Sequence, residues 1–432
     1  MKFKEPKNPN YAALIVKVDK LVPLAGLDKV QGAIILGNQV IVDISVKAGD
    51  IGIYFPLECQ LSNVYLSANN MYSNAEHNAD KTIKGYFKEN GRIRCIKFKD
   101  HKSEGLFMPI ESVTKLVSSS ENLHFVVGDT FDEIMGIEVC RKYIVKNYVE
   151  SDKISSSRQG KSNKKESRIA TGQFKFHADT QMMFRNLHKF HPDSVLSITY
   201  KLHGTSGISS YLLCNKKLKW YENILLALGV DLEINEYDYV YSSRKVIKSE
   251  VPSNPGYYKE DIWKLAHEQV QSALQKGMTF YYEIIGHLPS GKAIQGKYDY
   301  SCAKDEFVVA IYRITQTNVD GKVTEYSAKQ VQEFCKKNGL NAVPELYYGK
   351  ARDFYWDARV NYQTWLTRLL EKIKEAYNEK DCFLCVNKVP EEGCVVRIDG
   401  LDFNAFKVKS NRFYELETKQ LDKGEVNIEE EN

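Results

Sequence analysis

The chain has 432 residues, of which 43% are hydrophobic and 27% are charged, as is usual for a globular protein of two or three domains. No apolar run approaches the roughly 18 residues of a membrane-spanning helix, and residues 1–6 lack the apolar core of a secretory signal. We therefore expect an intracellular protein, cytoplasmic or nuclear, that has no membrane partner. The nine cysteines are expected to be reduced thiols.

The charge of the chain is unevenly distributed. The net charge is +4 at pH 7, but residues 410–432 hold seven acidic and three basic side chains. Residues 1–409 therefore carry a net charge of +8. This excess is compatible with a polyanionic partner, although a basic surface alone does not identify one.

Residues 1–150 are predicted to form a small β domain. Apolar, β-branched runs such as 12–18, 40–46 and 51–56 lack a helical period, and glycine turns separate several of them. Short strands of this kind favour a barrel, which we interpret as OB-like. Arg92 and Arg94 share one face of a further predicted strand, 92–98. That face is either a contact for nucleic acid or a solvated surface.

Residues 151–170 are predicted to be a flexible basic linker, because they combine basic residues and serines without an apolar period. The remaining residues, 171–432, alternate strands with amphipathic helices at 261–276, 328–337 and 360–377. This pattern predicts an α+β domain.

A lysine stands at the end of an apolar strand in the second domain. Residues 195–200 are rich in β-branched and aromatic side chains, and Lys201-Leu202-His203-Gly204-Thr205-Ser206 follows. Beside a metal or other cations, the amine of Lys201 can lose its proton and act as a nucleophile. Gly204 allows the backbone to approach a ligand closely. Taken alone, the pattern is more often a surface lysine before a turn.

Further polar side chains interrupt apolar segments downstream. Lys407 and Lys409 lie two apart on a predicted strand and therefore share a face that suits phosphate oxygens. Arg244 follows a tyrosine-rich strand. Glu283 and Glu392 adjoin apolar strands, where a buried carboxylate requires a cation, a metal or a hydrogen-bond donor.

The segments resemble the nucleotidyltransferase motifs of the covalent ligase and capping-enzyme superfamily. They are, in chain order, Lys201–Ser206, Ser243–Lys245, Phe280–Gly286, Phe307–Arg313, Glu392–Arg397 and Phe406–Lys409. The KLHGTS form of the first motif, together with the preceding β domain, resembles the Deinococcus- and Naegleria-type RNA ligases. The resemblance implies a nucleotidyltransferase domain with mostly antiparallel sheets.

The resemblance also implies roles for individual residues. Lys201 would be the nucleophile, Lys407 and Lys409 would hold phosphate, and Glu283 and Glu392 would position Mg²⁺ or Mn²⁺ through water. Tyr312 would stack on adenine, although it could equally be a core tyrosine. The other residues expected to bind ATP or AMP are Ile198, Thr199, Tyr200, His203, Gly204 and Arg244. His177, in a Phe176-His177 element upstream of the lysine, either helps enclose the nucleotide or is a core histidine.

The implied function is an ATP-dependent RNA ligase of RNA repair, which seals 5′-phosphate and 3′-hydroxyl ends through a lysyl-AMP and an RNA-adenylate. The alternatives are a non-catalytic nucleic-acid-binding protein, a DNA ligase or an mRNA capping guanylyltransferase. The last two carry a barrel after the final motif, where only residues 410–432 are present here. We expect a monomer. The residues leave open whether a nick, a tRNA break or a single strand is joined.

Overall fold

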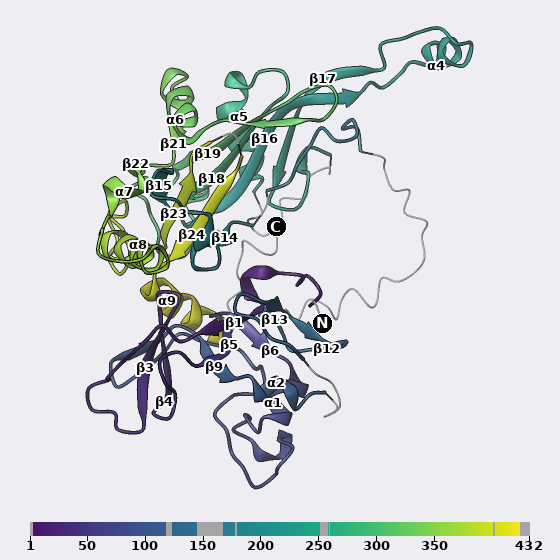
Figure 1. Ribbon diagram of the computed structural model, residues 1–432. Coiled ribbons are helices and arrows are strands. Elements are labelled where there is room, and N and C mark those ends of the chain that lie inside the picture. Colours follow the sequence, from purple (N-terminus) through teal and green to yellow (C-terminus); the bar gives the residue numbers. More distant parts are fainter. Residues whose placement is uncertain are drawn as a thin grey trace.

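The structure is a computed structural model of the chain. It describes residues 3–117, 123–144, 167–177, 179–250, 258, 260–400 and 402–423. Two lobes, one formed by the N-terminal residues and one by the remainder, meet at helix α9 (Asn411–Asp422) (Figure 1). Within the described ranges, none of the helices combines the length and apolarity that a membrane crossing requires.

The N-terminal lobe is built of short antiparallel strands, as the sequence predicts. Its largest sheet has four strands in the order β10 (Thr130–Phe131), β1 (Ala13–Lys17), β5 (Ile51–Phe55), β9 (Leu106–Pro109). A three-stranded sheet comprises β2 (Lys20–Val22), β3 (Val30–Ile35) and β4 (Asn38–Asp43). Two-stranded pairs are β6 (Cys59–Leu61) with β13 (Cys140–Lys142), β7 (Ile96–Phe98) with β8 (His101–Ser103), and β11 (Glu133–Ile134) with β12 (Ile137–Glu138). The short helices α1 (Asn63–Ala68) and α2 (Glu111–Thr114) complete the lobe.

The second lobe contains a large sheet of six strands. Four of them run in the order β17 (Asn235–Ser243), β16 (Thr205–Asn215), β18 (Met278–Gly286), β19 (Phe307–Thr317), and β20 (Val323–Glu325) and β21 (Asn341–Ala342) both pair with β19. Helices α5 (Ile262–Val270) and α6 (Ala328–Lys337) bury Trp263 and Val331 in the same apolar core as Phe280 of β18. The prediction of α6 is confirmed to the residue, whereas α5 ends earlier than expected and continues as a 3₁₀ turn, Gln271–Ala273.

A second sheet of five strands lies beside it. Its order is β14 (Gln181–Met182), β24 (Asn404–Lys409), β23 (Gly393–Ile398), β15 (Val195–Tyr200), β22 (Glu345–Lys350). All pairs are antiparallel except β14 with β24. Helix α8 (Tyr362–Tyr377) buries Trp365 and Leu369 against this sheet, and α7 (Ala351–Phe354) follows β22. The α+β class and the mainly antiparallel sheets are as predicted.

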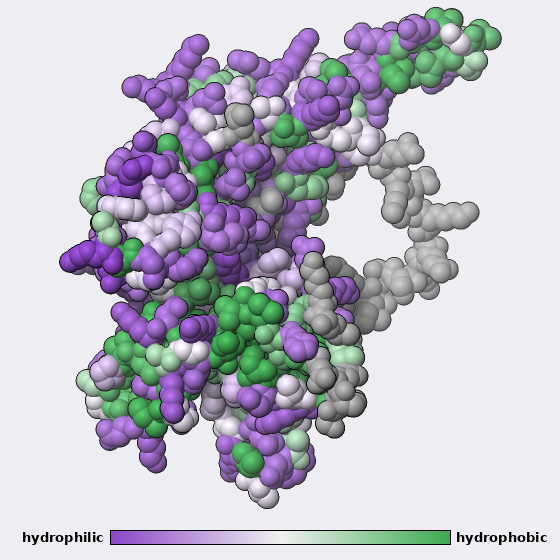
Figure 2. All heavy atoms as spheres, viewed as in Figure 1, coloured by the Kyte–Doolittle hydropathy of each residue, from purple (hydrophilic) through white to green (hydrophobic). Residues whose placement is uncertain are grey.

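One hairpin extends far beyond the body of the second lobe. Strands β16 and β17 pair continuously from Gly207–Ser243 to Asn215–Asn235, and α4 (Trp220–Ala227) caps the arm (Figure 1). Trp220 is 76% exposed and Leu228 is 74% exposed. The apolar tip is visible in Figure 2. This arm was not predicted from the sequence.

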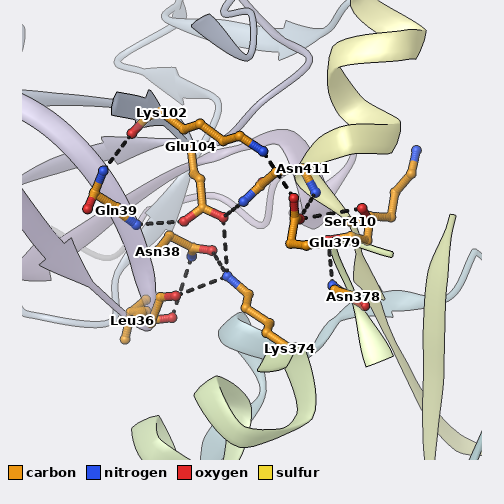
Figure 3. Close-up of polar contacts among 12 residues, drawn as sticks. Leu36, Asn38, Gln39, Lys102, Glu104, Lys374, Asn378, Glu379, Ser410 and Asn411 are labelled. Atoms are coloured by element: carbon orange, nitrogen blue, oxygen red, sulfur yellow. Dashed lines mark hydrogen bonds and ion pairs between the residues drawn. The ribbon is translucent and has the colours of Figure 1, made fainter. Parts of the chain in front are cut away.

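A polar network joins the two lobes (Figure 3). Lys374 of α8 donates to the carbonyl of Gly37 at 3.0 Å and to Asn38 Oδ1 at 2.8 Å. Lys102 of β8 donates to Glu379 Oε2, also at 3.0 Å. These contacts tie residues of the N-terminal strands directly to the lobe that follows the linker. Most of the predicted linker lies outside the described residues, but its end is ordered on the body, where Ile169 bridges to Cys214 of β16.

Candidate active site

Three neighbouring strands, β15, β23 and β24, form the floor of a cavity. Because alternate side chains of a strand point to one face, the register of the strands arranges the floor in rows. The rows are Lys201 with Gly393 and Lys409; Thr199 with Val395 and Lys407; and Ser197 with Arg397 and Ala405. The backbone N–H of Lys201 donates to the carbonyl of Gly393 at 2.9 Å. Lys201 is thus fixed at one end of the floor, immediately after β15.

The lysine end of the floor holds a short ion pair. Nζ of Lys201 lies 2.5 Å from Oε1 of Glu392, whose side chain is buried. Oε2 of the same carboxylate lies 3.7 Å from His203 Nδ1. The His203 ring packs edge-on against Tyr298 and Phe413, and its backbone N–H donates to the Tyr300 hydroxyl at 2.6 Å. The first and fifth of the six predicted motifs, Lys201–Ser206 and Glu392–Arg397, therefore meet through Lys201 and Glu392.

Two further lysines crowd this end. The pKa of Lys407 is lowered to about 7, mainly by burial and further by the positive charges of Lys409 and Lys201. Burial opposes protonation of Lys409 too, but Glu417 of α9, whose Oε2 lies 3.0 Å from Lys409 Nζ, raises the pKa of that amine well above its usual value. An anion between the lysines would relieve their mutual repulsion, which makes this end a suitable site for phosphate.

Glu283 enters the cavity from β18 of the larger sheet. It accepts a hydrogen bond from Ser206 Oγ at 3.2 Å, and Ser206 lies opposite it in β16. The Trp263 indole N–H donates to the carbonyl of Ser206 at 3.0 Å and holds that strand in place. Gly204 is required here by close approach, because a Cβ atom at that position would lie 2.2 Å from the carbonyl oxygen of Ile284.

The other end of the cavity is apolar. Val331 of α6, Val343 and Val395 line it together with the rings of Tyr312 and Phe403. The hydroxyl of Tyr312 lies 3.4 Å from His177 Nδ1, and the two rings meet edge to face. Burial, followed by the negative charge of Glu283, raises the pKa of Tyr312. A flat apolar slot with an aromatic wall suits a nucleobase.

The N-terminal lobe also contributes to the cavity wall. Tyr11, Glu58, Lys142 and Tyr143 line it. Lys142 places its Nζ over the Tyr11 ring, 5.2 Å from the centroid. Its positive charge helps to lower the pKa of Lys407, which places an N-terminal cation near the lysine end.

Most of the predicted nucleotide-binding residues line this one cavity. They are Thr199, Tyr200, Lys201, His203, Arg244, Glu283, Tyr312, Glu392, Lys407 and Lys409. Ile198 does not line the cavity, because its side chain points from the opposite face of β15 into the core beneath the sheet. Gly204 likewise lies behind the cavity wall, where its role is to permit close packing against β18.

Several residues that line the cavity were not predicted from the sequence. Asp179 pairs with Arg244, and although burial acts to raise its pKa, the charge and hydrogen bond of Arg244 lower it overall. Glu417, Lys142, Ser197 and Arg397 also line the cavity. Asp179 and Glu417 carry no pattern of their own in the sequence, because their partners are distant along the chain. Arg397 ends the fifth motif, and its alternation with Val395 and Gly393 could have placed it on the cavity floor.

The carboxylates at the lysine end could supply only some of the ligands of a divalent cation. Among the residues that the structure describes, no group of three or more histidine, cysteine, aspartate or glutamate side chains could bind a metal directly. Glu392 Oε2 is buried and makes no hydrogen bond to any described residue. A single carboxylate oxygen with water in the remaining positions is a coordination that Mg²⁺ accepts.

Taken together, a lysine paired with a buried glutamate, adjacent cations and an apolar slot lie in one cavity. Comparison with solved structures shows a similar fold in one RNA ligase. A mutant Naegleria gruberi RNA ligase solved with ATP and Mn aligns over 95% of this chain and 99% of its own, with a TM-score of 0.56 and 18% identity. The same ligase with PPi gives a TM-score of 0.56 at 18% identity, with 94% of this chain and 98% of that chain covered. A mutant with AMP and Mn gives 0.54 at 17% identity, with the same coverage.

The fold of this chain is therefore that of the Naegleria gruberi RNA ligase over both lobes. No protein-family model matches the sequence, and comparison with curated protein sequences gives no match.

Proposed function

We propose that the protein is an ATP-dependent RNA ligase that works through a covalent lysyl-AMP on Lys201. The observation that carries this proposal is the contact between Lys201 and Glu392 at 2.5 Å, with Lys407 and Lys409 beside them on one cavity floor. An amine that is held by a carboxylate next to a phosphate site and opposite an apolar slot has what adenylyl transfer requires.

The proposed reaction has three steps. The neutral amine of Lys201 attacks the α-phosphorus of ATP, a P–N bond forms, and the P–O bond to pyrophosphate breaks. The AMP then passes to the 5′-phosphate of an RNA end, which frees the lysine. Finally, a 3′-hydroxyl displaces AMP and forms the phosphodiester bond. Glu392, as the carboxylate in contact with Nζ of Lys201, is the group placed to orient the amine and to receive its proton.

A divalent cation fits this site through Glu283 and Glu392. The buried Oε2 of Glu392 has no hydrogen bond among the described residues, and Glu283 reaches the same cavity. Bound there, Mg²⁺ or Mn²⁺ would neutralise charge on the phosphate oxygens. Structures of the Naegleria gruberi ligase were solved with ATP and Mn and with AMP and Mn, which supports ATP and a divalent metal as cofactors here.

RNA is the proposed substrate, with 5′-phosphate and 3′-hydroxyl ends. The likeness to an RNA ligase extends over the N-terminal lobe, which we interpret as an OB-like domain, as well as over the catalytic lobe. The N-terminal lobe reaches the cavity through Lys142 and Tyr143, so it belongs to the working site. DNA ligase and capping guanylyltransferase are alternatives that the test below separates.

The test is covalent labelling followed by sealing. The protein is incubated with ATP or GTP that carries a radiolabelled α-phosphate, and the label on the protein is measured after denaturation. We expect label from ATP, and sealing of nicked RNA with little sealing of nicked DNA. Label from GTP with transfer to diphosphate-ended RNA would indicate a capping enzyme. The absence of any label would favour a non-catalytic binding protein.

A further inference from the structure

The floor of the cavity carries a buried guanidinium at the end opposite Lys201. Arg397 is 5% exposed and lines the cavity. One of its terminal nitrogens, Nη2, donates to the carbonyl of Tyr326. Its Nε and Nη1 have no hydrogen-bond partner among the described residues. The carboxylates that act on its charge are Glu325, which is paired with Arg313, and Asp399. Burying a cation with unpaired N–H groups costs free energy. Its position at the cavity wall therefore points to a ligand that carries a hydrogen-bond acceptor.

Ser197 lies directly opposite Arg397 in the register of β15 and β23. It is buried and also lines the cavity. Its hydroxyl donates to Glu345 Oε1 at 2.7 Å, which commits the only proton of the hydroxyl. Toward the cavity, Ser197 can therefore act only as an acceptor. The pair thus presents an acceptor beside a donor on one row of the floor.

This row lies at the base end of the cavity. Ser197 precedes Lys201 by four residues on an extended strand, a separation of about 13 Å. The phosphate-binding lysines occupy the first two rows, and the apolar slot lies toward the Ser197 row, where Arg397 also contacts the Phe403 ring. A nucleotide whose α-phosphate reaches Lys201 would direct its base toward Ser197 and Arg397.

We propose that Arg397 and Ser197 select adenine over guanine. The exocyclic N6 amino group of adenine is a donor that stands beside a ring-nitrogen acceptor, N1 on one side and N7 on the other. Ser197 accepts from N6, and Arg397 donates to the neighbouring ring nitrogen. Guanine places the O6 acceptor where adenine has its amino group, which leaves the Ser197 oxygen facing another acceptor. The inference rests on the proposed function for the placement of the nucleotide, but it concerns recognition of the base alone.

The test measures binding directly, so that it does not depend on catalysis. Isothermal titration calorimetry on the Lys201→Ala protein compares ATP, GTP, 7-deaza-ATP and 1-deaza-ATP. The variants are Arg397→Met and Ser197→Ala in the same background, and the control is Arg359→Met, whose side chain is 89% exposed. Circular dichroism and thermal melting confirm that each variant is folded.

We expect ATP to bind at least about tenfold more tightly than GTP, and one of the two deaza analogues to lose a similar factor. Arg397→Met should weaken the binding of ATP by that factor, and the variant should no longer distinguish ATP from the sensitive analogue. Ser197→Ala should reduce the preference for ATP over GTP. Folded Arg397→Met that binds ATP as the control does, or equal binding of ATP and both deaza analogues, overturns the inference. Tight, selective ATP binding, with no covalent labelling of the wild-type protein, would instead contradict the proposed ligase function.

Discussion

Nη1 of Arg92 lies 3.3 Å from Oδ1 of Asp422, a residue 330 positions further along the chain. Arg94 reaches Oδ2 of the same carboxylate at 3.2 Å. The side chain of Arg92 is fully buried and also forms a two-point ion pair with Glu58, both contacts measuring 2.8 Å. Helix α9 thus covers the two arginines that the sequence presented as a nucleic-acid contact or a solvated face. Neither alternative holds for Arg92, whose partners come from its own lobe and from α9.

Arg92→Ala is expected to destabilise the protein strongly. The substitution would leave the buried Glu58 without its guanidinium partner, and the loss of one member of a buried pair costs about 3–5 kcal/mol. Arg94→Ala is the matched control, because its side chain is 29% exposed and an exposed pair contributes less than about 1 kcal/mol. Urea unfolding followed by fluorescence would measure both. Similar unfolding free energies for the two variants would contradict the buried role of Arg92.

Lys201→Ala is expected to abolish covalent label from radiolabelled ATP while the protein stays folded, with a melting temperature lowered because the buried Glu392 loses its partner. Nζ of Lys201 contacts Glu392 but the side chain is partly exposed, so its removal leaves no large cavity. Lys201→Arg is the matched variant, because it keeps the charge without supplying a nucleophilic amine. Undiminished label on either protein would place the nucleophile elsewhere.

Glu283→Ala and Glu392→Ala are each expected to lower the rate of adenylylation by at least about a hundredfold, with the residual rate rising at high Mn²⁺ concentration. Glu392→Ala also removes the partner of Lys201. Glu333→Ala on the exposed face of α6 serves as the control. Rates would be measured by rapid quench across a series of metal concentrations. Wild-type rates with unchanged metal dependence in both variants would rule out the metal role.

The strand positions of several candidate residues were predicted from the sequence, because strand periodicity carries that information. Lys407 and Lys409 were expected to share a face, and both line the cavity. Lys201 was expected at the end of a strand, and β15 ends at Tyr200. In each case a local pattern, alternation on a strand or a glycine at a close approach, was sufficient.

What the sequence could not supply is contact between distant segments. From the sequence, residues 410–432 were described only as an acidic segment, yet Asn411–Asp422 form α9, whose Glu417 pairs with Lys409 and whose Tyr414 packs in the N-terminal core. The acids of α9 are spaced for a helix, but nothing local indicates which cations they meet. The β16–β17 arm was missed for another reason. Its tip helix, α4, is apolar on most sides and lacks the period that identifies a packed helix.

The free energy of unfolding is expected to depend on pH through Lys407. Its pKa is lowered to about 7 in the folded protein, from an ordinary value near 10.5. Between these two values the unfolded chain binds more protons at this side chain than the folded protein does, so the free energy of unfolding should rise with pH from about 7 to about 10.5. Below pH 7 the amine is protonated in both states, and its contribution no longer changes. Lys407→Met should remove this slope, whereas the exposed Lys350→Met should keep it.

The same group should take up a proton when nucleotide binds. At pH 8 the Lys407 amine is mostly neutral, because burial and the charges of Lys409 and Lys201 disfavour its protonation. Phosphate groups of ATP beside these lysines would reverse the sign of the local field and raise the pKa, so binding should take up a fraction of one proton. Calorimetric titration of the Lys201→Ala protein in buffers of different ionisation enthalpy measures that fraction. Lys201→Ala removes one of the cations that lower the pKa of Lys407, so the uptake measured is a lower bound on that of the intact site. Uptake that persists unchanged in Lys201→Ala Lys407→Met, or that is absent at pH 8 while ATP binds, would place the phosphates away from β24.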